Sequence, residues 1–148
     1  MNPHSSWSWP YFKWLFSEGL GFVNLPPFAW AGVLLAAGLI GSLALQKPFA
    51  RGRWKKRYWL AFSQLLFYPA IIAVGVLFRV PTQPTPIANP AAERALDVLF
   101  YLSLAFGGFR VYLMKSVRWL AFCLVGLQEI PIFGALLVAS MSVTGAWI

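Results

Sequence analysis

Histidine, cysteine and acidic residues are scarce in this chain of 148 residues, which holds one histidine, one cysteine and 4 acidic residues. The histidine, His4, lies near the N-terminus and outside every apolar segment. Bis-histidine ligation of a haem within a bilayer and most histidine-based metal sites are therefore excluded. The single Cys123 can form neither a dithiol pair nor an intramolecular disulfide. We expect no cofactor and no metal ion.

The same scarcity argues against catalysis. A serine triad requires a histidine beside the nucleophile, and the only histidine is close to the N-terminus. No glycine-rich phosphate-binding loop is present in the sequence. Three of the four acidic residues, Glu18, Glu93 and Asp97, are expected near one membrane face, apart from Glu129. A paired-carboxylate site cannot be assembled from this set, so we expect a protein that is not an enzyme.

Charge is scarce as well, since 11% of the residues are charged and 59% are hydrophobic. A soluble domain of this size could not cover so much apolar surface, and no run alternates with the period of two that is typical of strands. Apolar runs of about 18 to 25 residues predict helices that cross a bilayer, because a helix satisfies its own backbone in lipid. Four such runs are present, at residues 28–46, 58–78, 95–114 and about 119–145.

The segment before the first run is aromatic and amphipathic. Its tryptophans at positions 7, 9 and 14 suit the head-group layer, where an aromatic ring keeps one polar edge in water. We expect residues 9–23 to form an interfacial helix on the outer leaflet, with a fifth span as the alternative. The predicted fold is an all-α membrane protein. An interfacial aromatic arm at 1–27 precedes a compact bundle of four transmembrane helices at 28–148.

The connectors predict the orientation of the chain. The loop between the first two runs carries six positive charges, and the turn between the last two runs adds Lys115 and Arg118. The positive-inside rule places both connectors in the cytoplasm and both termini outside, and we expect a bacterial inner membrane. The basic loop is expected to contact anionic lipid head groups rather than nucleic acid. Its charged residues are Lys47, Arg51, Arg53, Lys55, Lys56 and Arg57.

Charged residues also mark the expected outer edge of the third run. Arg94 and Asp97 lie three residues apart, which places them on neighbouring positions of a helix surface. We expect an ion pair there, with Arg79 close enough to join it. Such exposed pairs contribute little to stability.

Glu129 is the one ionisable side chain in the apolar tract 119–138. It lies 11 residues beyond Arg118, hence roughly 16 Å from the cytoplasmic edge at a rise of 1.5 Å per residue. Ionisable groups at such depth usually face the bundle interior and have partners. Counting residues from the basic connectors in the same way places several hydroxyl and amide side chains at about the depth of Glu129. We therefore predict an intramembrane polar site formed by Glu129, Gln128, Tyr68, Ser103 and Gln64.

Two prolines lie at matching depth in the second and fourth runs. Pro69 removes the hydrogen bond to the carbonyl of Leu65, and Pro131 removes the bond to that of Leu127. We predict a helix break at each. Prolines are also common in transmembrane helices as static kinks, and that alternative stays open.

The charge of Glu129 depends on its partners. Arg110 is the only cation from a neighbouring span that could pair with it. It lies nearer the cytoplasmic edge, so we expect its side chain to extend toward the head groups. A direct pair with Glu129 is the alternative. Without that pair, we expect a protonated Glu129 that donates to a polar side chain or a freed carbonyl.

Two classes of function fit these features. The first is an accessory or assembly subunit of a larger membrane complex, because the chain is small and lacks cofactor ligands. The second is a small proton-coupled transporter with Glu129 as the titrating group. It would be an oligomer, because four helices rarely enclose a substrate cavity. The expected partner is accordingly another membrane protein or a further copy of this chain.

Overall fold

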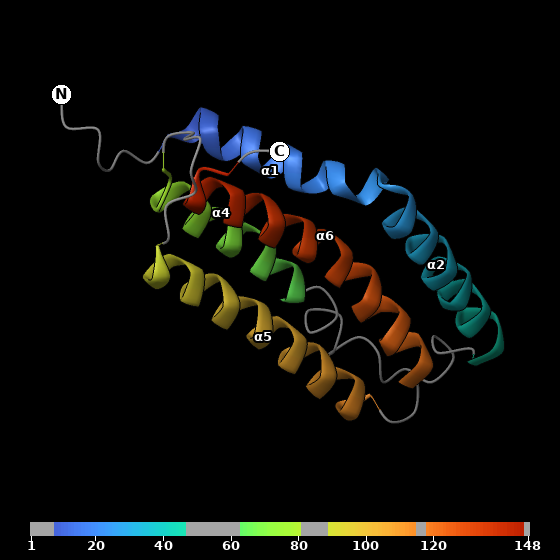
Figure 1. Ribbon diagram of the computed structural model, residues 1–148. Helices are drawn as coiled ribbons and strands as arrows, with labels where there is room; N and C mark the ends of the chain where they lie inside the picture. Colours follow the sequence, from blue (N-terminus) through green and yellow to red (C-terminus); the bar gives the residue numbers. More distant parts are fainter. Residues whose placement is uncertain (1–7, 47–62, 81–88, 115–117, 147–148) are drawn as a thin grey trace.

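The computed structural model describes residues 8–46, 63–80, 89–114 and 118–146, and these residues form helices and no strand. Figure 1 shows their order along the chain. The elements are α1 (Trp9–Gly21), η1 (Phe22–Asn24), α2 (Pro26–Gln46), η3 (Ser63–Leu66), α4 (Phe67–Leu77), α5 (Pro90–Leu113) and α6 (Arg118–Thr144).

Three of these helices are long and apolar enough to cross a membrane, namely α2 over Pro26–Ala44, α5 and α6. The described part of the chain is thus all-helical, and the protein is an integral membrane protein. The second expected span is described only in part, as the shorter apolar helix Ser63–Leu77. The basic loop at 47–57 lies outside the described residues.

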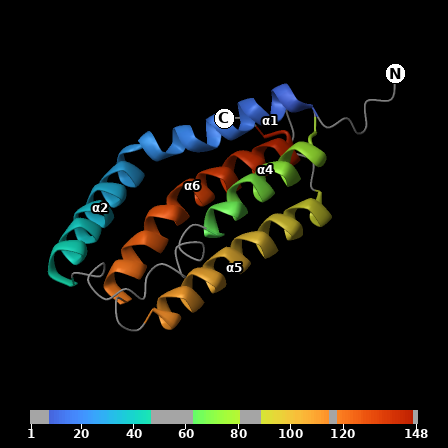
Figure 2. The same ribbon diagram turned by 180° about the vertical axis from the view of Figure 1, so that it is seen from behind.

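Helix α6 occupies the centre of the molecule and contacts each of the other helices. In Figures 1 and 2, α1 and α2 follow one side of α6, whereas α5 lies on the opposite edge with α4 beside it. The central position suits α6, because small residues recur along it and allow neighbours to approach closely.

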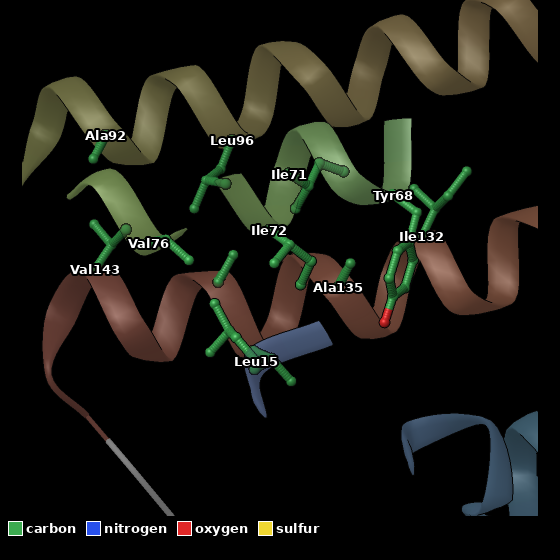
Figure 3. Close-up of a cluster of buried hydrophobic side chains, with 12 residues drawn as sticks. Leu15, Tyr68, Ile71, Ile72, Val76, Ala92, Leu96, Ile132, Ala135 and Val143 are labelled. Atoms are coloured by element: carbon green, nitrogen blue, oxygen red, sulfur yellow. The ribbon is translucent and has the colours of Figure 1, made fainter. Parts of the chain in front are cut away.

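The core lies where α1, α4, α5 and α6 meet, and Figure 3 shows their apolar side chains pointing toward one another. Leu15 comes from α1 and is fully buried. The aliphatic side chains of the other three helices surround it. The cluster consists of Leu15, Tyr68, Ile71, Ile72, Val76, Ala92, Leu96, Ile132, Ala135, Val138, Ala139 and Val143.

Helix α1 packs lengthwise against the C-terminal half of α6. The hydroxyl of Tyr11 lies 2.8 Å from that of Ser142 near one end. Near the other end, a Cβ placed on Gly19 would lie 3.3 Å from the Cα of Ala135. The expected arm therefore shares one hydrophobic core with the helices at 63–144.

Helix α2 continues along α6 where α1 ends. The rings of Phe28 and Phe133 lie 5.6 Å apart near the middle of α6. Further along, a Cβ on Gly38 would lie 2.8 Å from the sulfur of Cys123. Residues 22–25 separate the two helices, and Pro26 is tolerated as the first residue of α2 because that position needs no backbone donor. The pair α1–α2 thus follows α6 over most of its length.

Candidate functional site: a buried polar cluster

Gln64 links two ionisable residues on different helices. Its side-chain oxygen accepts a hydrogen bond from Nη1 of Arg110 at 3.0 Å. Its side-chain nitrogen donates to Oε1 of Glu129. This orientation suits an amide, because a guanidinium group can only donate and a carboxyl oxygen can accept. Arg110 and Glu129 are therefore connected through one amide group.

Ser103 completes the cluster from α5. Its hydroxyl oxygen lies 3.2 Å from Oε2 of Glu129 and 2.9 Å from the carbonyl oxygen of Phe100. A hydroxyl has one proton, so it can donate to only one of these two acceptors at a time. With Glu129 ionised, Ser103 donates to the carboxylate. With Glu129 protonated, Ser103 can donate to Phe100 and accept from the carboxyl group.

Arg110 corrects one expectation from the sequence. Its side chain does not extend toward the head groups, because only 2% of its surface is exposed. Nη1 also donates to the side-chain oxygen of Gln128 at 3.4 Å. Among the described residues, Nε of Arg110 is buried without a hydrogen-bond partner. The direct pair with Glu129 is replaced by the bridge through Gln64.

Gly107 explains how this inward orientation is accommodated. It lies on α5 close to Arg110, on the same buried side of the helix. A Cβ on Gly107 would lie 2.9 Å from Nε2 of Gln64 and 2.7 Å from a methyl group of Val125. Any larger residue would displace the amide. The glycine thus makes room for the Gln64 side chain between α5 and α6.

Tyr68 lies outside the cluster, although its depth predicted that it would join. Its hydroxyl donates to the backbone carbonyl of Phe16 in α1. Its ring meets that of Phe16 edge-on, with centroids 4.6 Å apart. The structure therefore brings together Glu129, Gln128, Ser103 and Gln64. It assigns Tyr68 to the contact between α1 and α4.

The two prolines differ in their effect. Pro69 lies in the first turn of α4, which follows the 3-10 turn Ser63–Leu66 without a gap, so the helix type changes near Pro69 but the chain stays helical from Ser63 to Leu77. Pro131 lies inside α6, which runs without interruption from Arg118 to Thr144. The predicted break at Pro131 is thus not observed. A single missing backbone bond is compatible with a continuous helix when the neighbouring turns remain bonded.

A second buried polar contact was not anticipated from the sequence. Ser142 donates to the carbonyl of Gly75 at 2.7 Å, so the hydroxyl of Tyr11 donates in turn to Ser142. The guanidinium group of Arg79 lies 4.0 Å from the centre of the Tyr11 ring. The only sequence signal was the placement of Tyr11 in the aromatic arm. This contact joins α1, α4 and α6 at the opposite end of the molecule from Arg110.

The chemistry available to these groups is proton exchange and hydrogen bonding. The part of the chain that the structure describes contains no group of three or more histidine, cysteine or acidic side chains that could hold a metal ion. Comparisons with protein-family models, with curated proteins and with solved structures found no match.

Proposed function

We propose that this protein is a non-enzymatic accessory or assembly subunit of a larger membrane complex. In this proposal four helices span a bacterial inner membrane, α1 packs along the outer half of α6, and the basic connectors are cytoplasmic. The polar cluster holds η3, α5 and α6 in one arrangement. The exposed side of α2 receives the partner protein.

The unequal burial of the spanning helices is the main support for this proposal. Only 6% of the most apolar stretch of α2 is buried within the chain, compared with 39% of that of α6. Trp30 and Leu34 of α2 are 70% and 72% exposed. The polar groups of the cluster, in contrast, are directed toward one another. A chain that turns its polar groups inward and leaves one apolar helix largely uncovered suits assembly more than transport.

Purification in a mild detergent from the native host tests the proposal. We expect a second, larger membrane protein at fixed stoichiometry. A photo-reactive amino acid at Leu34 should attach to that protein. The same probe at Leu120, which is 2% exposed, is the matched control and should not attach to it. Recovery of this chain alone, with probe products formed only with lipid, would contradict the accessory role.

A proton-coupled transporter is the second candidate, and the Ser103 hydroxyl favours it. Because that hydroxyl can turn between Phe100 and Glu129, the cluster accepts both protonation states of Glu129 with little movement of heavy atoms. Proton-carrying sites require this property. Aromatic side chains of Phe67 and Phe133 would suit a lipophilic or cationic substrate.

Substitutions of Glu129 separate the two candidates. In liposomes with an enclosed pH indicator, a transporter should conduct protons, and Glu129→Gln should abolish that flux while the protein still folds and assembles. An accessory subunit should give no flux above that of empty liposomes. In that case Glu129→Gln should assemble normally, whereas Glu129→Ala should weaken assembly because Gln64 and Ser103 lose their partner. Normal assembly of both variants without any flux would contradict both roles of Glu129.

A further inference from the structure

Helix α5 has two opposite faces of different character. Its buried residues all lie on one side, toward α4 and α6. With 3.6 residues per turn, successive residues are about 100° apart, and seven exposed residues, Pro90 and six that follow it, fall within about 40° of the direction opposite to Arg110. In both Figures 1 and 2, α5 forms an edge of the molecule. We call these six residues the α5 stripe: Arg94, Asp97, Tyr101, Ala105, Gly108 and Tyr112.

Tyr101 lies near the middle of α5. It is 11 residues from Pro90 and 12 from Leu113, hence roughly 17 Å from either helix end at 1.5 Å per residue. Its side chain is 67% exposed. Within the described chain its ring contacts that of Phe100, with centroids 6.1 Å apart, and its hydroxyl has no hydrogen bond.

This depth is unusual for an outward-facing tyrosine. Tyrosines on lipid-facing surfaces concentrate at the head-group level, where the hydroxyl meets water. Tyr101 lies four residues below Asp97, about 6 Å along the axis from the outer membrane edge. Lipid tails offer neither donor nor acceptor, so a hydroxyl left among them is unfavourable. A polar group of another molecule at this level would satisfy the hydroxyl within the apolar layer.

We propose that the α5 stripe binds the same stripe of a second copy of this chain, with the two helices parallel about a two-fold axis along the membrane normal. Such an axis brings identical residues together at identical depth. One Tyr101 hydroxyl can then donate to the other, because a phenol both donates and accepts. No other partner residue has to be assumed. This interface is separate from the exposed side of α2 and does not depend on the accessory role.

The small residues of the stripe permit the close approach that this pairing needs. Ala105 and Gly108 follow Tyr101 on the same face, and small residues at a helix surface let two backbones meet. A Cβ placed on Gly108 would meet no atom of the described residues within 4 Å. The space beside Gly108 is thus open to a second helix.

The charges at the outer end are self-complementary. Among the described residues neither Arg94 nor Asp97 takes part in an ion pair, contrary to the expectation from the sequence. They lie three residues apart, hence about 4.5 Å along the axis. A parallel two-fold pair would place each arginine beside the aspartate of the other copy. The pairing therefore forms two equivalent ion pairs at the membrane edge.

Two glycines provide a matched test of the interface. Gly108 of α5 and Gly41 of α2 both have open space where a Cβ would be, so leucine at either position fits the isolated chain. Counting subunits of the labelled protein in lipid bilayers should give dimers for the unchanged protein and for Gly41→Leu. Gly108→Leu should give monomers. A monomeric unchanged protein, or equal dimer fractions for the two variants, would overturn the proposal.

Cross-linking tests which face is in contact. In a Cys123→Ala background, Ala105→Cys should form a disulfide-linked dimer in native membranes on mild oxidation. Leu102→Cys is the control, because it is exposed on another face of α5 at nearly the same depth. Equal cross-linking at both positions, or linkage of Ala105→Cys to a different protein, would contradict pairing with a second copy.

The hydroxyl of Tyr101 can be tested separately. Tyr101→Phe should lower the association constant of the dimer by roughly threefold, the usual effect of one hydrogen bond between helices in a bilayer. The fold of each chain should be unchanged, since the hydroxyl has no partner within the described chain. An unchanged association constant would exclude the proposed contact between the two hydroxyls.

Discussion

Arg110 donates to the side-chain oxygen of Gln64 over 3.0 Å. Both side chains are closed off from solvent, with exposed fractions of 2% and 0%. A buried cation whose main contact is a neutral amide depends strongly on that amide. The amide in turn is oriented by its bond to Glu129. Substituting Gln64 should therefore lower the stability of the contact between η3, α5 and α6 more than substituting any neighbouring residue of η3.

Replacing Gln64 should destabilise the folded protein. Gln64→Leu keeps much of the volume but removes the acceptor of Arg110 and a donor to Glu129. Losing a hydrogen bond to a charged group costs about 1.5 to 3 kcal/mol. Unfolding in mixed detergent measures the change. Leu66→Ala is the control, because Leu66 belongs to the same 3-10 turn and is 69% exposed. A Gln64→Leu protein as stable as the control would contradict a structural role of the amide.

A double substitution should show how much of the destabilisation comes from the charge of Arg110 rather than from the other groups of the cluster. A buried charge without partners is more unfavourable than an apolar side chain of similar size. We therefore expect Arg110→Met to recover part of the stability lost in Gln64→Leu. The coupling between the two positions should be at least about 0.5 kcal/mol. Four unfolding measurements complete the cycle, and strictly additive effects would mean that the two side chains act independently.

Tyr68 should hold α1 against α4. Tyr68→Phe keeps the ring but removes the hydroxyl that donates to Phe16. The expected cost is about 0.5 to 1.5 kcal/mol. Faster hydrogen exchange of the α1 amides should report it locally. The comparison is Ser17→Ala, which removes a hydroxyl bonded within α1 itself. If exchange in α1 is equal in the two variants, the contact with Phe16 does not stabilise that helix.

Two Gly→Ala substitutions should change stability in opposite directions. A Cβ on Gly75 would lie 2.9 Å from the Cα of Ala139, so Gly75→Ala must push α4 away from α6. Such overpacking typically costs about 1 to 3 kcal/mol. At Gly41 nothing lies within 4 Å, and alanine there should stabilise the helix by roughly 0.5 to 1 kcal/mol. Thermal unfolding of both variants tests the signs, and a stabilising Gly75→Ala would refute the close contact.

Alkaline pH should weaken the outer contact at Tyr11. Burial raises the pKa of Tyr11 above its ordinary value of 10.0, although the Ser142 hydroxyl and the charge of Arg79 lower it in part. As pH rises past 10.0, the unfolded chain loses this proton first. Stability therefore falls until the folded pKa is passed. The fall in stability at alkaline pH should be smaller in Tyr11→Phe than in the unchanged protein. The unfolding free energy measured as a function of pH tests this. Identical alkaline slopes would contradict this role.

The all-helical class and three of the spans could be predicted from the sequence. Hydropathy and length are local properties, and lipid leaves few alternatives to a helix for a long apolar run. Glu129 could be singled out for the same reason, since one carboxyl group in an apolar tract is visible without any structure. Ser103, Gln64 and Gln128 followed from depth alone. Depth depends only on residue counts and the helix rise.

The direction in which a side chain points around its helix axis could not be predicted in the same way. Arg110 and Tyr68 each point to a neighbour that their depth in the sequence did not predict. Which way a side chain points depends on how its helix is rotated against the others. For α5 that rotation is fixed by small residues such as Gly107, which let Gln64 enter between helices.

The sequence by itself determined that the chain is helical, apolar and marked by one carboxyl group within a long apolar run. Only the tertiary structure decided that α1 joins the core through Leu15, and that an amide connects Arg110 to Glu129. The physical reason is the range of the interactions involved. The length of an apolar run depends only on residues that follow one another in the sequence. The contacts of Leu15, Arg110 and Glu129 join residues far apart in the chain, and they form only after the helices have packed.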